Sequence, residues 1–179
     1  MVSGELYQAG DPELVESRTR ARRLTALYNA TVPDDEAGRR ALLEQLLGAG
    51  GDHAWIEPPF FCDYGWNISL GNGVFMNFNC VVLDVAPVRV GEQTLFGPAV
   101  QLCAATHPLD PRERERGLEY GEPIDIGRNV WVGAGVIVGA GVTIGDHSVI
   151  GAGSVVVRDV PAGVLAAGSP CRVIRELAG

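Results

Sequence analysis

A six-residue repeat of branched aliphatic residues constrains the fold of this chain more than any other feature. The lead residues are Ile126, Val132, Val138, Ile144, Ile150 and Val156, and a glycine follows each of the first five. Neither an α-helix nor an alternating strand has a period of six. A parallel β-helix of triangular cross-section has this period, with one hexad on each face and the lead aliphatic pointing inward. A flexible Gly-rich segment, the alternative, would not keep aliphatics in register.

The glycine after each lead residue suits a tight corner, where a Cβ would clash or where φ must be positive. The repeat continues upstream with interruptions. Val90, Phe96 and Leu102 keep the spacing, as do Leu70, Met76, Val82 and Val88, but a two-residue shift separates the two sets. The stretch between Leu102 and Ile126 has three prolines, a mixed charge cluster and no aliphatic residue at a hexad position. We therefore predict a loop over residues 108–121 that leaves the prism, and long loops on rigid scaffolds often carry function.

The first 55 residues have helical rather than hexad spacing. Asp11 and Pro12 are typical of a helix start, and apolar residues then recur at helical spacing up to Asn29. A second helix is expected from about Thr31–Asp35 to Leu47. Two short helices do not fold alone, so we expect them to cover the base of the prism. The predicted parts are a helical cap segment over residues 1–55, a β-helix over 56–168 and a C-terminal tail over 169–179.

Composition excludes several classes of function. The net charge of −8 argues against nucleic-acid binding and against an anionic membrane surface. The four cysteines, with no CxxC pair, argue against a zinc site or a disulfide framework and favour reduced thiols in the cytoplasm. The start of the chain has no signal-peptide pattern, and no stretch has the length of a membrane span. These features favour a soluble cytoplasmic protein.

Several stretches resemble the maltose and galactoside O-acetyltransferases of the hexapeptide-repeat superfamily. They are GELY and DPEL near the start, IEPPFFCDYGWNISLGNGVFMNFNCVVLD, GPAVQLCAATHPLD, PIDIGRNVWVGAGVIVGAGVTIG, SVIGAGSVVVRDVP and AAGSPCRVIRE. The resemblance covers essentially the whole chain. It implies a left-handed β-helix that assembles as a homotrimer, acetyl-CoA as the donor, a sugar as the acceptor and no metal. It also implies active sites between adjacent subunits.

His107 is the candidate general base. The chain has three histidines, and His107 lies immediately before the predicted loop. An imidazole can take a proton from a sugar hydroxyl near neutral pH as that oxygen attacks a thioester. From position alone, a loop histidine with a structural hydrogen bond remains an alternative. In the resembling family the histidine of this THP-like stretch is the general base.

The resemblance also implies four acceptor contacts. Asn77 carries over as a catalytic residue that binds the acceptor hydroxyl and senses developing charge, and Asp84 as a sugar contact or an orienting partner for the base. Asp63 and Arg18 match positions that contact acceptor in relatives. Each has a structural alternative, such as a turn aspartate or a solvated helix arginine. Ala9 stands where the family has an acidic or polar contact, which departs from the pattern.

Six residues are expected to bind acetyl-CoA, again from the resemblance. The stretch from Trp131 to Ala134 supplies an oxyanion-binding amide and a wall for the pantetheine arm, and Ala152 supplies a backbone contact to the adenine. Arg158, Arg172 and Arg175 supply cations for the phosphates, a task suited to arginine. A solvated helix face is the structural alternative for these arginines. No serine or cysteine nucleophile is expected, so transfer should be direct, and Glu119 is a weak candidate to support the base.

Three other hypotheses remain open. An acyltransferase of the same fold can act on an acceptor that is not a sugar. A β-helix carbonic anhydrase with a subunit-bridging zinc needs three histidine ligands, and this chain has only His53, His107 and His147. A non-catalytic β-helix used for assembly would not need the combination of His107, Asn77 and the tail arginines.

Overall fold

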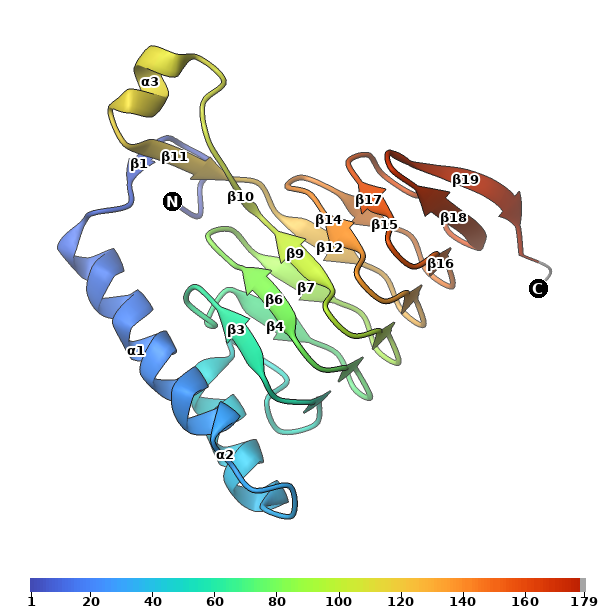
Figure 1. Cartoon of the computed structure of the whole chain (residues 1–179), viewed down its shortest axis with the longest axis horizontal. Coiled ribbons are helices and arrows are strands. Elements are labelled where there is room, and N and C mark those ends of the chain that lie inside the picture. Colours follow the sequence, from blue (N-terminus) through green and yellow to red (C-terminus); the bar gives the residue numbers. More distant parts are fainter. Residues whose placement is uncertain (178–179) are drawn as a thin grey trace.

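The computed structural model describes residues 1–177 as a triangular parallel β-helix with two helices along one end (Figure 1). Strands β2 (Trp55–Ile56), β5 (Phe75–Met76), β8 (Leu95–Phe96), β13 (Trp131–Val132), β16 (Val149–Ile150) and β18 (Val164–Gly168) form the first wall. Strands β3 (Phe60–Cys62), β6 (Cys80–Leu83), β9 (Gln101–Cys103), β14 (Ile137–Val138) and β17 (Val155–Val156) form the second wall. The third wall contains β4 (Ile68–Leu70), β7 (Val88–Val90), β12 (Ile124–Ile126) and β15 (Thr143–Ile144). The chain passes through the three walls in that order, so the fold prediction is confirmed.

The lead residues of the hexads fill the interior of the prism. All six from Ile126 to Val156 are buried, and five of them have no exposed surface. Ile126 pairs with Ile144, eighteen residues further on, whereas Leu70 pairs with Val90, twenty residues further on. The earlier coils are therefore two residues longer than the later ones. This difference explains the two-residue shift in the sequence repeat.

The glycines that follow the lead residues leave room for the next coil. A Cβ at Gly133 would lie 2.6 Å from the backbone nitrogen of Ala152. Positive φ falls two residues later in this corner, at Gly135 with φ of +67°. Steric closeness, rather than φ, is therefore the reason for glycine at position 133.

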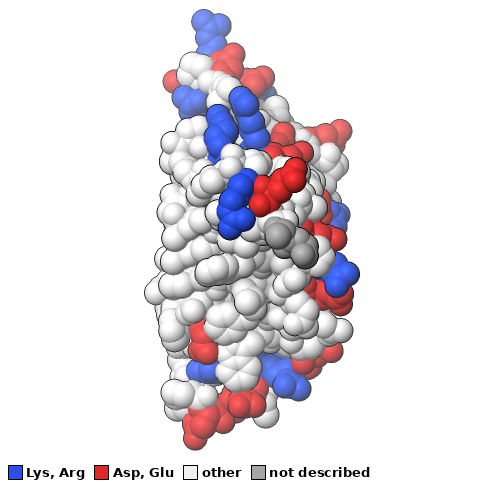
Figure 2. Space-filling model, turned by 90° about the vertical axis from the view of Figure 1, so that its right-hand side faces the viewer, with Lys and Arg blue, Asp and Glu red and all other residues white. Residues whose placement is uncertain are grey.

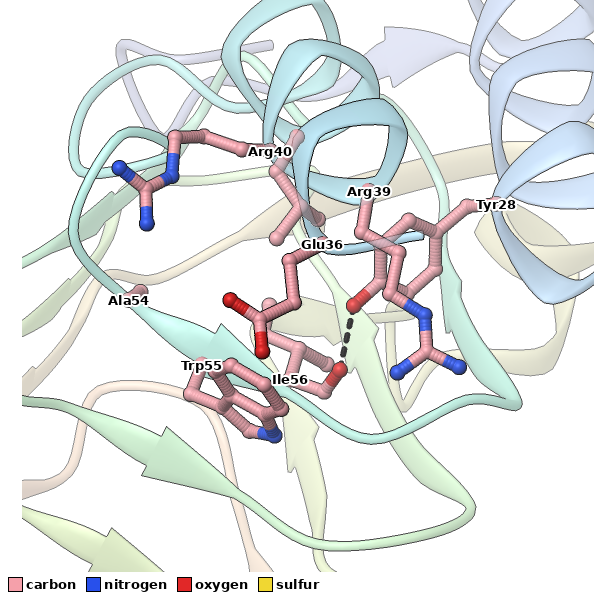
Figure 3. A pocket seen from close by; sticks show the side chains of 8 residues that line it. Tyr28, Glu36, Arg39, Arg40, Ala54, Trp55 and Ile56 are labelled. Atoms are coloured by element: carbon pink, nitrogen blue, oxygen red, sulfur yellow. Dashed lines mark hydrogen bonds between the residues drawn. The ribbon is translucent and has the colours of Figure 1, made fainter. Parts of the chain in front are cut away.

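The helical cap begins where the sequence predicts. Helix α1 (Pro12–Asn29) starts after Asp11, whose side chain accepts a hydrogen bond from the Glu13 amide at 3.0 Å. Helix α2 (Glu36–Leu46) is capped in the same way by Asp35. Figure 3 shows how the cap is joined to the base of the prism: the buried Tyr28 hydroxyl donates to the Ile56 carbonyl oxygen.

The predicted loop leaves the prism but is not irregular throughout. It contains helix α3 (Pro111–Glu115) and strand β11 (Leu118–Gly121). Strand β11 pairs antiparallel with β10 (Ala105–Thr106) on one side and with β1 (Tyr7–Gln8) on the other. In Figure 1 this small sheet stands off one edge of the prism and brings the N-terminal segment to the loop. The partner strand β1 is more than a hundred residues away in sequence, so no local pattern indicates the pairing.

The C-terminal tail forms a strand. Strand β19 (Cys171–Glu176) pairs antiparallel with β18 and extends the first wall. A helical tail, the structural alternative for Arg172 and Arg175, is therefore wrong. Residues 178 and 179 of the predicted tail lie outside the described residues.

Candidate active site

An open cleft lies where the second wall meets the third, beside the small sheet of the loop. It is lined by Ala9, Arg18, Arg22, Asp63, Tyr64, Leu83, Val85, Ala105, His107 and Glu119. These residues come from the N-terminal segment, α1, the corner after β3, the end of β6, β10, the residue after β10, and β11. Three of the predicted site residues, His107, Asp63 and Arg18, are therefore together in one cleft.

His107 stands at the mouth of this cleft, one residue after β10. Its side chain is 57% exposed, so the imidazole is open to a ligand. Its Nε2 lies 3.9 Å from Oε2 of Glu119. The position therefore allows contact with an acceptor from solvent.

Arg18 is held by the protein and gives the cleft a positive charge. Its guanidinium donates to the Tyr64 hydroxyl and to the Ala9 carbonyl oxygen, both at 2.6 Å, and lies 5.6 Å from the centre of the Tyr64 ring. Burial raises the pKa of Asp63, and nearby Arg18 opposes this effect. Ala9 therefore contributes a backbone oxygen where the family pattern expects a side-chain contact.

Asp84 has a structural role in place of the predicted sugar contact. Its side chain has no exposed surface, and its carboxylate accepts hydrogen bonds from the backbone amides of Asp63, Tyr64 and Asn67. Because the second–third corner buries it, Asp84 cannot reach an acceptor. It fixes the backbone that carries Asp63, and Val85, the next residue, faces the cleft instead.

Asn77 is not part of this cleft. It lies between β5 and β6, at the edge where the first wall meets the second, and its Oδ1 accepts a hydrogen bond from the Phe78 amide at 2.8 Å. His107 follows the other end of the second wall. The width of this wall separates the two predicted catalytic residues within one chain.

Five of the six residues predicted to bind acetyl-CoA share the first wall or its edge with the second. Trp131 is 58% exposed on the first wall, and the Gly153 amide donates to the Ala134 oxygen at 2.8 Å, which stacks the Ala134 and Ala152 corners. Arg172 and Arg175 are exposed on β19. Arg158 differs, because it follows β17 at the edge of the second wall where His107 lies. The structure does not bring all six together in one chain.

The face that carries the C-terminus has charged side chains in its upper part and a largely uncharged band below them. Figure 2 shows charged side chains along one margin and toward the two ends, with an uncharged band between them. Any phosphates would therefore depend on individual arginines rather than on a basic face.

Sequence reasoning missed several residues of the cleft. Tyr64 and Val85 were not expected there, Glu119 was only a weak candidate, and its hydrogen-bond partner Tyr7 was not expected either. Tyr7 belongs to the GELY stretch, and Tyr64 to the CDYG stretch, both of which carry the family resemblance. Those motifs were the available signal. The antiparallel pairing that places Tyr7 beside Glu119 was not visible in the sequence.

The described residues, 1–177, bear on the other hypotheses in two ways. No group of three or more His, Cys, Asp and Glu side chains in this range is placed to hold a metal ion. His53 contacts Asp52, and His147 contacts Asn129, so neither joins His107 in this chain. The described helices include none that is both long and apolar enough to cross a membrane.

A hexad-built β-helix with a helical cap and a histidine beside an edge cleft defines the class of hexapeptide-repeat transferases. Residues 1–51 match the maltose acetyltransferase hexapeptide capping motif, and residues 123–158 match the bacterial transferase hexapeptide, six repeats. The chain is 51% identical to nodulation protein L of Rhizobium meliloti (strain 1021) over 97% of this chain and 94% of that protein.

Solved structures agree with this assignment over the whole chain. A maltose O-acetyltransferase from Clostridium difficile 630 superimposes with a TM-score of 0.97 at 44% identity, covering 99% of this chain and 95% of that one. A galactoside acetyltransferase in complex with coenzyme A superimposes with a TM-score of 0.95 at 41% identity, covering 98% and 88%. The chain is an acetyltransferase that belongs to the hexapeptide-repeat family of the maltose and galactoside acetyltransferases.

Proposed function

We propose that this chain transfers an acetyl group from acetyl-CoA to a hydroxyl of a sugar of the maltose, glucose or galactoside kind. The observation that carries the proposal is the cleft that the exposed His107 imidazole lines together with Asp63 and Arg18. A carboxylate and a guanidinium are the groups that bind sugar hydroxyls, and an open imidazole is the group that removes a hydroxyl proton. The coenzyme A complex of a similar galactoside acetyltransferase supports the donor.

The reaction is direct transfer. His107 takes the proton from the acceptor hydroxyl while that oxygen bonds to the carbonyl carbon of the acetyl thioester. The carbonyl electrons move onto its oxygen, which a backbone amide of the Trp131–Ala134 corner stabilises. The carbonyl then re-forms as the carbon–sulfur bond breaks, and the leaving coenzyme A sulfur takes the proton from the imidazolium. Most of the rate comes from holding the two substrates in line.

The site requires two subunits. Asn77, Ala134 and Ala152 lie at one edge of the second wall, and His107 and Arg158 lie at the other. A neighbouring chain can place its Ala134 edge against the His107 cleft, which joins acceptor and donor sites. Trp131 then forms the wall of the pantetheine arm, and Arg158, Arg172 and Arg175 bind the phosphates. A homotrimer in which each interface holds one active site fits this distribution of the acceptor and donor residues over two edges.

An acceptor that is not a simple sugar is the second candidate. Ala9, Leu83, Val85 and Ala105 give the cleft an apolar side, which suits a more apolar acceptor. We place either activity in the cytoplasm, supported by four cysteines that are all unpaired.

The test is release of the coenzyme A thiol from acetyl-CoA in the presence of maltose, glucosides and galactosides. We expect sugar-dependent release by the wild type and a loss of about 10²–10⁴ in kcat for His107→Ala, since one general base supplies about that factor. His147→Ala, at the corner between the third and first walls, is the matched control and should keep its activity. Thermal stabilisation by coenzyme A without release for any sugar would favour the non-sugar acceptor. Full activity of folded His107→Ala would refute the assignment of His107 as the general base.

A further inference from the structure

Tyr7 and Glu119 form a fixed pair that directs a carboxylate into the acceptor cleft. The β1–β11 register sets Tyr7 opposite Glu119, and the Tyr7 hydroxyl donates to Oε1 of Glu119. Burial raises the pKa of Tyr7, and the bond to Glu119 raises it further. The hydroxyl therefore stays protonated and remains a donor, so Glu119 is held in one orientation.

The second oxygen of Glu119 is directed at the place where an acceptor would react. Oε2 lies 3.9 Å from Nε2 of His107, which is too long for a direct hydrogen bond. Within residues 1–177 the structure gives Oε2 no hydrogen-bond donor. Only 16% of the Glu119 side chain is exposed. A carboxylate oxygen with no donor from the protein gains a charge-assisted hydrogen bond when a hydroxyl reaches it.

Within residues 1–177, neither cleft arginine, Arg18 or Arg22, donates a hydrogen bond to Oε2. Arg18 already donates to Tyr64 and to Ala9. Asp63 carries the same sign of charge as Glu119; burial raises the pKa of Asp63, and the charge of Glu119 adds to that rise. A hydroxyl donor from the acceptor is therefore the group that best satisfies Glu119.

We propose that Oε2 of Glu119 binds a second hydroxyl of the acceptor, close to the hydroxyl that His107 deprotonates. The proposal rests on the acetyl transfer proposed above and narrows its substrate class to acceptors with at least two neighbouring hydroxyls. One hydroxyl donates to Nε2 of His107 and reacts, while the other donates to Glu119 and fixes the orientation of the ring. Tyr7 is a positioning residue in this arrangement, because it acts through Glu119.

The experiment compares kcat/KM for methyl α-D-glucopyranoside and methyl β-D-galactopyranoside with the values for their monodeoxy derivatives. One of the monodeoxy derivatives keeps the reacting hydroxyl but lacks the hydroxyl that binds Glu119. For the wild type we expect kcat/KM for this derivative to be about tenfold to a hundredfold lower than for the parent sugar, the effect of losing a hydrogen bond to a charged group. The double variant Tyr7→Phe/Glu119→Met removes both partners at similar volume. In this variant, kcat/KM for the parent sugar and for the derivative should differ by no more than about threefold. Glu119→Gln keeps the length and should lie between.

Glu122→Gln, which removes an exposed carboxylate just outside the cleft, is the matched control and should keep the wild-type ratio. If the double variant loses activity equally for every acceptor and keeps the ratio, Glu119 acts on the base or on the fold and the proposal is wrong. A wild type that releases thiol with none of these acceptors contradicts the proposed sugar transfer itself. Thermal midpoints and coenzyme A binding identify any variant that fails to fold.

Discussion

Asp84 shapes the acceptor cleft without entering it. Its carboxylate accepts three backbone amides from the corner that carries Asp63 and Tyr64, and no surface of Asp84 is exposed. Burial raises its pKa from the usual value of an aspartate to about 6, although the amide hydrogen bonds oppose this. A residue chosen from the sequence as a ligand is thus a structural acceptor.

The raised pKa makes one contribution to stability depend on pH. Between about pH 4 and pH 6 the folded chain binds a proton at Asp84 more tightly than the unfolded chain, so stability falls as pH rises through this window. The two-unit shift corresponds to about 3 kcal/mol. We expect the free energy of unfolding of the wild type to fall by about that amount relative to Asp84→Asn between pH 4 and pH 6.5. Urea titrations at each pH measure it.

The control for this series is Asp34→Asn, which replaces an exposed carboxylate in the turn before α2. Its stability difference from the wild type should stay flat over the same range. A flat difference for Asp84→Asn as well would mean that the Asp84 carboxylate is not desolvated as the structure indicates.

At the scale of single coils, the hexad sets both the register and the closeness of successive turns. Gly133 and Gly139 each follow a lead residue, yet their surroundings differ. A Cβ at position 133 would lie 2.6 Å from the Ala152 nitrogen, whereas a Cβ at position 139 would have only ordinary contacts, from 3.5 Å. Equivalent positions of the repeat therefore differ in their tolerance of a side chain.

We expect Gly133→Ala to lower the free energy of unfolding by about 1–3 kcal/mol, because the backbone of two coils must move apart. Gly139→Ala is the matched control, since it makes the same change at the same position of the repeat. It should be neutral or stabilise by up to about 1 kcal/mol through the unfolded state. Denaturant midpoints of the two variants give the comparison, and equal effects would contradict the steric argument.

Across the whole molecule, the outward residues divide the three walls into two kinds. The first wall presents the ladder Trp55, Phe75, Leu95, Trp131, Val149 and Leu165. The second wall presents Phe61, Val81, Gln101, Ile137 and Val155. The third presents Ser69, Arg89, Asp125 and Thr143, with an ion pair of 3.0 Å between Arg89 and Asp125. Large exposed apolar patches mark interfaces, so the first and second walls are the ones suited to contact neighbouring chains in the proposed trimer.

We expect the wild type to sediment as a trimer and Leu95→Asp to dissociate it, because a carboxylate would be buried in the centre of the first-wall ladder without a partner. Ser69→Asp places the same charge on the third wall and should leave the trimer intact. Analytical ultracentrifugation measures both, with activity assayed in parallel because the site is shared. A wild type that is monomeric at micromolar concentration would refute the trimer.

The sequence predicted the repetitive part of this protein because its determinants are local. The lead aliphatics, the following glycines and the Asp11–Pro12 helix start each act on neighbours within a few residues, and all three appear as predicted. The motif around His107 likewise placed the histidine beside the loop. Family and architecture therefore follow from the sequence alone.

The cleft was decided by contacts between segments that are distant in the chain. The pairing of β1 with β11 brings Tyr7 to Glu119 across 112 residues, and no periodicity encodes it. The sequence predicts Asp84 as a ligand, whereas the folded corner places three backbone amides around its carboxylate. Asn77 and His107 lie at opposite edges of the second wall. The edge at which a residue lies depends on how many residues each corner of the prism contains, so the sequence spacing does not give it directly. Such distances exist only in the folded molecule, so the tertiary structure alone decided them.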